Sequence, residues 1–556
     1  MNRSVTKFSC SPAFIIAGAA TALCVSPNAP QAQAQAAFNI AVGGQAPVSL
    51  TRLRCEYLQN PLGIDSAKPR LSWITTAPAR GWMQSAYQIQ VASTPALLQN
   101  NKPDLWDSGK VSSAQSLNVS YNGKALASGT KAFWKVRVWD KAGQPTAYSP
   151  AQSWQMGLLK GDDWKAQWIG TTLSRTQQQN GLVLPTPPFL RKTFNLNKPV
   201  RSATLYASAR GVYELRVNGA KVGDEVLAPG WTDYGTRIQY QTYDVTSGLK
   251  QGTNAIGAIL GDGWYSGYVG FGANRNHYGS ETAFIGQLVV TFTDGTTQTI
   301  GTDTTWQNSA GPIEYSDMLQ GEFYDARKVQ PGWDTANFRN AAWQSAVVVP
   351  APTQNILDVT AKLKAAVVNN TLTVTSGNDI GGDPAYGLVK QLKVDYTLNG
   401  QEKSRTLAER EVLTIPGPGE TAGPLVIRSA EYGALNLAKK GPAVLVGTKD
   451  PAIRVTQELK PKGITQPKPG NFILDMGQNM VGVMRLRVQA PAGTRIQLRF
   501  AEMLNPDGTA YTANLRSARA TDTYICSGNG VETWEPRFTF HGFRYVEVTG
   551  FPGTPT

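Results

Sequence analysis

The segment 261–279 combines the two kinds of side chain that a sugar-binding site needs. A sugar presents an apolar C–H face and a ring of hydroxyl groups, so its site needs an aromatic plate beside amide, carboxylate or guanidinium partners. Six glycines give this backbone the freedom to form a cleft. Between them stand Asp262, Trp264, Tyr265, Tyr268, Phe271, Asn274, Arg275, Asn276, His277 and Tyr278. The carbohydrate-binding candidates are Asp262, Trp264, Tyr265, Asn274 and Arg275. The alternative is that the rings belong to a core and the glycines serve tight turns.

Four carboxylates in glycine-rich or aromatic contexts are the candidates for acid–base chemistry: Asp262, Glu322, Asp325 and Glu502. Glycoside hydrolysis needs two carboxyl groups, roughly 5–9.5 Å apart across the bond, one protonated and the other ionised. The sequence does not establish whether any two of them approach so closely. Glu322 and Asp325 are close in sequence to Arg327, which favours a structural ion pair. No catalytic residue is therefore predicted.

The sequence offers few residues for other kinds of catalysis or for metal binding. Histidine occurs only at positions 277 and 541, so a multi-histidine zinc site is not expected and a Ser-His-Asp hydrolase has just two candidate bases. We expect His541, which follows Phe540, to be a packing residue and His277 to be exposed in its loop. The glycine-rich stretches precede no helix start, so they do not indicate phosphate-binding loops.

The first 36 residues have the pattern of a secretory signal peptide. A charged start is followed by an apolar stretch over 13–25 and by Ala-x-Ala cleavage sites in 32–36. The apolar run is too short to cross a bilayer, and the leucine before Cys24 argues against a lipid anchor. No later segment reaches 18 consecutive apolar residues. We therefore expect a secreted or periplasmic chain without a membrane span.

Charge and cysteine content fit an exported protein without a nucleic-acid partner. The chain has 53 Lys and Arg against 39 Asp and Glu, a net charge of +14, which becomes +12 without the signal peptide. These cations are scattered singly through strand-like segments, so we interpret them as a solvated surface. Outside the signal peptide the cysteines are Cys55 and Cys526. Their separation favours two separate thiols over a bridge.

The dominant hydrophobic period is two, which is the period of β-strands. Alternating segments occur at 87–91, 134–138, 215–217, 484–488 and 496–500. Asn or Asp before Gly marks tight hairpin turns at 218–219, 294–295 and 399–400. Long amphipathic helical patterns are almost absent. We therefore predict an all-β chain of tandem sandwiches.

Composition shifts divide the mature chain into four units. A first unit at 47–157 has the size of an immunoglobulin- or fibronectin-like sandwich, and a second at 164–349 is long enough for a jelly roll. A third unit at 357–449 has strands of its own between polar, Pro- and Gly-rich links. The last unit occupies 450–556.

Motifs in three of these units stand in an order typical of one family. The first unit carries Pro61-Leu62-Gly63-Ile64-Asp65 and Pro69-Arg70-Leu71-Ser72-Trp73. The second carries Leu227-Ala228-Pro229-Gly230-Trp231-Thr232-Asp233-Tyr234, Leu260-Gly261-Asp262-Gly263-Trp264-Tyr265 and Gly321-Glu322-Phe323-Tyr324-Asp325-Ala326-Arg327. The last carries Phe472-Ile473-Leu474-Asp475-Met476-Gly477-Gln478-Asn479 and Phe538-Thr539-Phe540-His541-Gly542-Phe543-Arg544-Tyr545. Together they resemble the opening sandwich, jelly-roll domain and concanavalin-like sandwich of the bacterial α-L-rhamnosidases, glycoside hydrolase family 78. Segment 357–449 lies outside the resemblance and looks like an inserted β module.

The resemblance implies the non-catalytic part of an enzyme that releases terminal α-L-rhamnose from glycosides. In that family an (α/α)₆ helical barrel holds the catalytic carboxylates, and its acidic run Asp-x-x-x-Arg-Asp-Glu-Arg does not occur here. We therefore expect a supporting or substrate-binding half that is inactive alone, either from a truncated or split system or as a fragment of a longer protein. Its implied partners are rhamnosyl glycosides or oligosaccharides and a separate barrel, for which the last unit should expose an apolar surface. The alternative is a stand-alone, secreted rhamnose-binding protein.

Calcium is the one ion that the resemblance introduces. Some jelly-roll domains of the family bind rhamnose through calcium, which prefers oxygen ligands. Asp262, Asn274 and Asn276 could supply three such ligands. Because three donors in one loop are a weak basis, no cofactor is predicted and calcium stays open.

Overall fold

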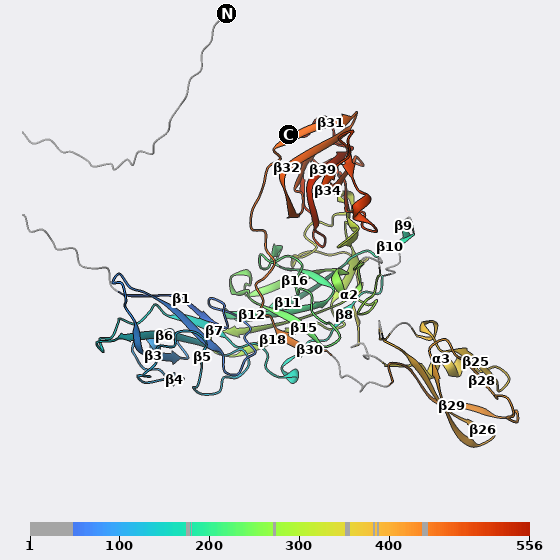
Figure 1. Ribbon diagram of the computed structural model, residues 1–556, viewed down its shortest axis with the longest axis horizontal. Helices are drawn as coiled ribbons and strands as arrows, with labels where there is room; N and C mark the ends of the chain where they lie inside the picture. The colour runs from blue at the N-terminus through green and yellow to red at the C-terminus, as the bar shows by residue number, and fades with distance from the viewer. Residues whose placement is uncertain are drawn as a thin grey trace, which may run out of the picture. The chain divides into compact units, whose positions relative to one another are not determined.

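The computed structural model describes residues 48–556, apart from 174–177, 180, 271–273, 351–355, 382–383, 386–387 and 436–442 (Figure 1). The predicted signal peptide lies outside these residues. Strands dominate the described chain, and its α-helices are the short α1 (Pro95–Gln99), α2 (Gly263–Ser266) and α3 (Thr360–Ala365). None of these helices is long and apolar enough to cross a membrane. The predicted all-β fold class is confirmed.

The first domain is a sandwich of two antiparallel sheets around a tryptophan-rich core. One sheet has the order β1 (Ser49–Cys55), β2 (Arg70–Thr76), β5 (Val119–Ser120). The other has the order β4 (Trp106–Asp107), β3 (Gln84–Ala92), β6 (Lys131–Asp140), β7 (Gln152–Gln155). Trp73, Trp134 and Trp154 are buried between them. Cys55 belongs to this core and Cys526 to the core of the last domain, each as a free thiol, which confirms two separate cysteines.

The second domain has two larger sheets that share one core. The first follows the order β14 (Ala220–Lys221), β13 (Val212–Val217), β16 (Gly252–Gly261), β11 (Pro188–Leu196), β19 (Gln307–Ala310), β22 (Gln344–Ser345). The second follows β23 (Val347–Val348), β8 (Ile169–Gly170), β17 (Ala283–Phe292), β12 (Val200–Arg210), β15 (Arg237–Asp244), β30 (Val444–Gly447), with β18 (Thr297–Gly301) also paired to β17. A separate short ladder joins β9 (Gln178–Gln179) to β10 (Leu182–Val183).

The third unit has its own core. One sheet has the order β24 (Ile356–Asp358), β29 (Leu425–Gly433), β26 (Gln391–Leu398), β27 (Gln401–Ala408), and a second joins β25 (Leu372–Thr375) to β28 (Val412–Ile415). Leu363 of α3 is buried in the same core. The predicted turn between β26 and β27 is confirmed, because Asn399 and Gly400 both have positive φ, 52° and 77°, and Leu398 pairs with Gln401.

The last domain is built on a seven-stranded sheet. Its order is β20 (Ile313–Asp317), β21 (Gly321–Asp325), β37 (Thr521–Ile525), β34 (Arg495–Ala501), β39 (His541–Thr549), β32 (Asn471–Gly482), β31 (Gly463–Lys468). Two short ladders accompany it, β33 (Leu486–Gln489) with β38 (Val531–Trp534) and β35 (Met503–Leu504) with β36 (Ala510–Tyr511).

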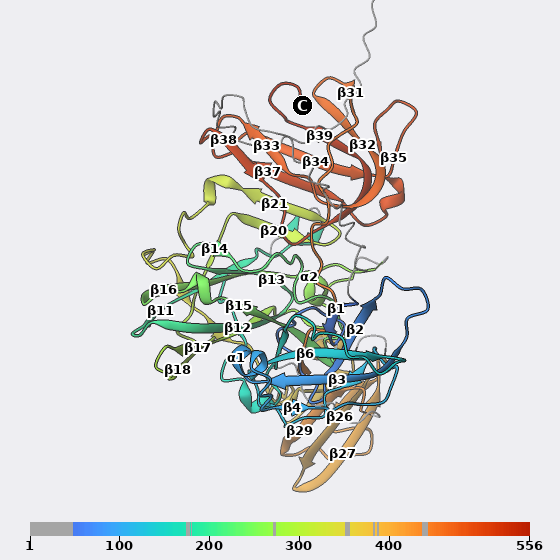
Figure 2. The ribbon, with the colours of Figure 1, turned by 90° about the vertical axis from the view of Figure 1, so that its left-hand side faces the viewer.

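Two strand pairings cross the boundaries expected from the sequence. The β20–β21 hairpin falls within 164–349 but extends the sheet of the last domain, where β21 runs parallel to β37 and Phe323 pairs with Thr523 (Figure 2). Strand β30 falls within 357–449 but pairs in parallel with β15 of the second domain. Alternation of apolar residues identifies a strand but not its partner, so composition alone does not locate these exchanges. The first pairing joins the second and last domains through backbone hydrogen bonds, and the second joins the third unit to the second domain.

Candidate ligand-binding sites

The loop after β16 is fixed at its base by a buried ion pair. Asp262 precedes α2 and is 4% exposed. Arg275 donates from Nη2 to Asp262 Oδ2 at 2.5 Å, and its guanidinium lies 5.6 Å from the centroid of the Tyr268 ring. Two of the five predicted binding residues therefore engage each other. Phe271, part of the predicted loop, lies outside the described residues.

A second acid, Asp317, ties the loop to the β20–β21 hairpin. Its Oδ2 accepts a hydrogen bond from the backbone N–H of Tyr268 at 2.8 Å, and Oδ1 accepts from Leu319 and Gln320 at 2.9 and 3.0 Å. Burial raises the pKa of Asp317 to about 6, and the nearby charge of Asp262 acts in the same direction. The hydrogen bond between Tyr268 and the buried Asp317 therefore fixes the loop to the β20–β21 hairpin.

The aromatic residues of the loop divide into an inner and an outer group. Tyr265 is 3% exposed and packs edge-on against Tyr234. Trp264 is half-buried and stacks on Trp231, whose side chain is 56% exposed, with ring centroids 6.0 Å apart and an interplanar angle of 9°. The Trp231 indole N–H donates to Tyr278 Oη at 3.1 Å. The outer group, which we call the tryptophan platform, consists of Trp231, Trp264 and Tyr278.

The sequence analysis named Trp264 as a candidate but did not single out Trp231, on which Trp264 stacks. Trp231 stands in the motif Pro229-Gly230-Trp231, which contributed only to the family resemblance. Asn274 is exposed on the loop, and its backbone carbonyl accepts from Val269 N–H at 3.0 Å. The structure therefore brings Asp262 and Arg275 together, stacks Trp264 on an unpredicted partner, and places Tyr265 in a core.

The loop does not fit a calcium ion as it is arranged. The carboxylate of Asp262, the strongest candidate ligand, faces the guanidinium of Arg275, which already supplies the positive charge that calcium would bring. Asn274 and Asn276 are exposed. In the described part of the chain, no group of three or more His, Cys, Asp or Glu side chains is placed to hold a metal.

The remaining candidate acids lie in separate hydrogen-bond networks. Glu322 is fully buried, and its Oε2 accepts from Ser316 Oγ and from Arg537 N–H, each at 2.9 Å. Burial raises the pKa of Glu322 to about 7. Asp325 pairs with Arg327 at 2.8 Å, and this hydrogen bond lowers the pKa of Asp325. The ion pair expected from the sequence is confirmed for Asp325 alone.

Glu502 is exposed and accepts hydrogen bonds from two amides. They come from Asn479 Nδ2 at 3.3 Å and Asn514 Nδ2 at 3.1 Å. The four candidate acids thus have three kinds of environment: Glu322 is fully buried, Asp262 and Asp325 pair with arginines, and Glu502 accepts from amides. This arrangement matches structural roles better than the opposed acid and base of glycoside hydrolysis.

His541 is a packing residue, as predicted. Its ring stacks on Phe500 with centroids 4.0 Å apart, and its Nε2 lies 3.1 Å from both carboxylate oxygens of the buried Asp522. His277 was expected to be exposed but is half-buried, because its ring packs edge-on against Tyr278 at 4.7 Å. Packing onto an aromatic neighbour is not visible in a loop sequence.

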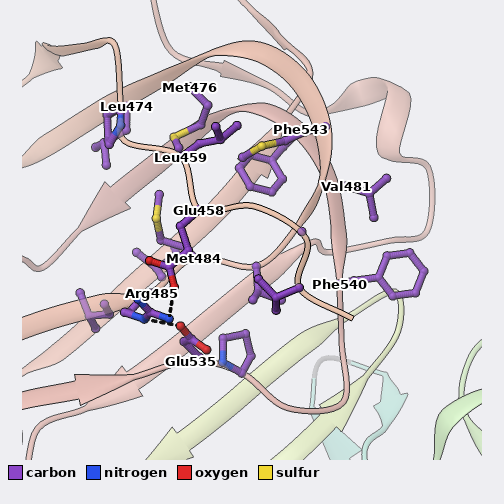
Figure 3. A pocket seen from close by; sticks show the side chains of 18 of the residues that line it. Glu458, Leu459, Leu474, Met476, Val481, Met484, Arg485, Glu535, Phe540 and Phe543 are labelled. Carbon is purple, nitrogen blue, oxygen red and sulfur yellow. Dashed lines mark hydrogen bonds and ion pairs between the residues drawn. The ribbon is translucent and has the colours of Figure 1, made fainter. Parts of the chain in front are cut away.

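The last domain contains an open apolar cavity of about 1100 Å³ (Figure 3). Figure 3 shows Leu459, Leu474, Met476, Met484 and Phe543 around it, with Arg485 bonded to Glu458 and Glu535 at one end. Val481 on its border is 74% exposed. Leu474, Met476 and Phe543 belong to the buried core of the domain, so the exposed apolar surface here consists of residues such as Val481.

Comparison with known families identifies three domains of this chain. The α-L-rhamnosidase N-terminal domain matches residues 198–377. The Rha78A-like N-terminal immunoglobulin domain matches residues 50–160, and the bacterial α-L-rhamnosidase concanavalin-like domain matches residues 465–556. The order of the three matches is the order expected from the sequence motifs.

Curated relatives match most of this chain but only about half of their own length. An α-L-rhamnosidase of Streptomyces avermitilis is 33% identical over 90% of this chain and 56% of its own. One of Formosa agariphila is 36% identical over 90% of this chain and 45% of its own.

Solved structures agree with these matches. The α-L-rhamnosidase of Dictyoglomus thermophilum superposes with a TM-score of 0.70 at 31% identity, covering 92% of this chain and 48% of that one. The Streptomyces avermitilis enzyme, solved in complex with L-rhamnose, gives 0.70 at 30% identity over 91% of this chain and 56% of that one. This chain belongs to the bacterial α-L-rhamnosidase family and carries the family's β-sandwich domains, with no helical barrel among its described residues.

Proposed function

We propose that this chain is the non-catalytic, β-sandwich half of an α-L-rhamnosidase, and that it supports a catalytic domain and binds terminal α-L-rhamnose of glycosides. The observation that carries this proposal is the ordered match of three rhamnosidase domains on a chain that spans about half the length of its curated relatives. The N-terminal signal pattern supports secretion or delivery to the periplasm.

The environments of the candidate acids support inactivity of the chain alone. Hydrolysis requires a proton donor and an ionised base or nucleophile that both reach the glycosidic bond. Glu322 has a suitably raised pKa but is fully buried, whereas Asp325 is engaged by Arg327. A sugar cannot reach the buried carboxyl group of Glu322. The negative charge of Asp325 is compensated by the guanidinium of Arg327.

The apolar cavity of the last domain favours the proposal that this chain supports a catalytic domain. A monomeric protein rarely leaves exposed apolar side chains such as Val481 beside an open cavity of about 1100 Å³, unless the surface is used for binding. The partner proposed for this surface is the helical catalytic domain. The Arg485 ion pairs at its edge offer polar contacts for the rim of such an interface.

The tryptophan platform supports sugar binding and also favours the second candidate function, a stand-alone secreted rhamnose-binding protein. Trp231 presents an exposed, flat apolar surface that suits the C–H face of a deoxy sugar. Asn274 stands exposed on the adjoining loop as a candidate partner for hydroxyl groups.

Two measurements on the purified chain test these functions. We expect no release of aryl alcohol from an aryl α-L-rhamnoside, with a full-length family member as the positive control. Turnover above the uncatalysed rate would contradict the claim of inactivity. Calorimetric titration with L-rhamnose, with and without calcium, tests binding, and we expect heat that does not depend on calcium. Absence of heat in both titrations would count against a binding role.

A further inference from the structure

The chain passes from the second domain to the last domain through an exposed segment. Residues 448–462 lie between β30 and β31 and contain neither helix nor strand; we call them the strap. Most side chains of the strap are exposed, among them Ile453 at 47% and Val455 at 64%. The matched family domains end before the strap or begin after it, so they assign it no role.

Few bonds hold the backbone of the strap. Between residues 449 and 461, the described chain shows one backbone–backbone hydrogen bond, from Val226 N–H to the carbonyl oxygen of Ile453 at 3.0 Å. Residues 455–457 make no hydrogen bond or ion pair within the described chain. A protease needs a substrate backbone that is exposed and free of such bonds, and these two properties decide where a folded chain is cut. The strap has both properties.

Arg454 gives the strap a specific cleavage site. Its side chain is 44% exposed, and its Nε donates to Asp224 Oδ1 at 2.7 Å. The Asp224 side chain is itself 73% exposed, and exposed ion pairs of this kind contribute little free energy. The guanidinium can therefore leave Asp224 and enter a pocket with an aspartate at its base, which is the specificity pocket of trypsin-like serine proteases.

The lysines of the strap are less suitable for the same protease. Lys460 precedes Pro461, whose ring and missing N–H disturb the backbone at the bond to be cut. Lys449 forms an ion pair at 2.8 Å with Asp65, whose side chain is only 19% exposed. Lys462 directly precedes the paired strand β31. The single arginine of the strap is therefore its best-placed cation.

Cleavage of the strap would not release the last domain. The β20–β21 hairpin precedes the strap in the chain, yet it belongs to the seven-stranded sheet of the last domain. Glu322 N–H donates to the buried Asp522 at 2.9 Å, and Arg537 N–H donates to Glu322 Oε2 at 2.9 Å. Tyr324 stacks on Tyr524 with ring centroids 5.7 Å apart. None of these contacts involves the strap, so each of them remains after cleavage.

We propose that the strap is a processing site at which a trypsin-like serine protease hydrolyses the peptide bond between Arg454 and Val455, and that the cleaved chain stays assembled as two fragments. Water adds across the bond, which leaves a carboxylate on Arg454 and an amino group on Val455. The β20–β21 hairpin then holds fragment 455–556 without a covalent connection. This inference does not depend on sugar binding or on a catalytic partner.

Limited digestion of the purified chain with trypsin tests the cleavage site. We expect an early fragment whose N-terminal sequence is Val455-Thr456-Gln457. Arg454→Gln should slow the formation of this fragment by about tenfold or more, because the cation that fills the specificity pocket is lost. Arg454→Lys is the matched control, since it keeps a cation that trypsin accepts, and it should be cut at the same bond. Early cleavage elsewhere with this bond intact would overturn the assignment, and so would unchanged cleavage of Arg454→Gln.

Size-exclusion chromatography of the digested chain tests the assembly. We expect fragment 455–556 to elute together with the remainder of the chain in buffer and to separate from it in concentrated urea. Elution of fragment 455–556 alone in buffer would show that the hairpin does not hold it, and would overturn the proposed two-fragment protein.

Discussion

The indole rings of Trp231 and Trp264 lie 6.0 Å apart, with 9° between their planes, although 33 positions separate them in the chain. Trp264 is half-buried, and Trp231 is the more exposed of the two. The pair therefore combines a fixed inner ring with an accessible outer ring, which is the arrangement a sugar-stacking surface requires.

Replacement of Trp231 should weaken sugar binding while lowering the stability of the fold only modestly. We expect Trp231→Ala to weaken L-rhamnose binding by about tenfold, because the exposed stacking surface is lost. The free energy of unfolding should fall by about 1 kcal/mol, because the stack on Trp264 is lost but the Trp231 side chain is largely exposed. Calorimetric titration and chemical denaturation measure the two effects. Unchanged affinity would remove the platform from the binding site.

The Asp262–Arg275 pair should be strongly coupled. Their side chains are only 5% and 12% exposed, so Asp262→Asn leaves a guanidinium without its countercharge and should cost about 3 kcal/mol. The double variant Asp262→Asn, Arg275→Met removes that uncompensated charge and should recover part of the loss. Denaturation of the wild type, both single variants and the double variant gives the coupling energy. Simple additivity would show that the pair contributes no mutual stabilisation.

Glu322 should make stability decline as pH rises. Its pKa is about 7 in the folded chain against an ordinary 4.5, so ionisation opposes folding between these values and the cost is complete above pH 7. The difference corresponds to on the order of 3 kcal/mol. We expect Glu322→Gln to match the wild type at pH 4 and to be more stable at pH 8. Glutamine can keep both hydrogen bonds, because Ser316 and Arg537 donate to the same oxygen. Parallel stability curves from pH 4 to 8 would contradict this explanation.

The stability of the strand pairing between β21 and β37 should depend on Gly321. Gly321 has φ of +92°, and a Cβ there would lie 2.1 Å from the carbonyl oxygen of Thr521. Gly321→Ala should therefore cost about 3 kcal/mol or more, since both the backbone angle and the contact are unfavourable. Gly295→Ala is the control, because Gly295 has φ of +87° but open space around it; it should cost about 1 kcal/mol. Equal losses would show that the crowded contact is unimportant.

Local features of this fold could be predicted from the sequence. The alternating pattern identified the strands, and Asn399-Gly400 identified a hairpin turn, because both depend on neighbours in the chain. The partners of β21 and β30 could not be predicted, since their pairings join segments about 200 residues apart.

The candidate site was predictable in composition but not in geometry. The loop 261–279 was recognised from its aromatic and polar residues, yet composition does not show that Arg275 neutralises Asp262 or that Tyr265 points into a core. Trp231 reaches the site from a different segment, so no local pattern could include it.

The third unit begins and ends at one edge of its sheet, because Ile356 of β24 pairs with Gly433 of β29. A segment whose two ends are neighbours needs only two adjacent attachment points to the rest of the chain. The edge formed by β24 and β29 is therefore a suitable place at which to replace this segment by a foreign domain.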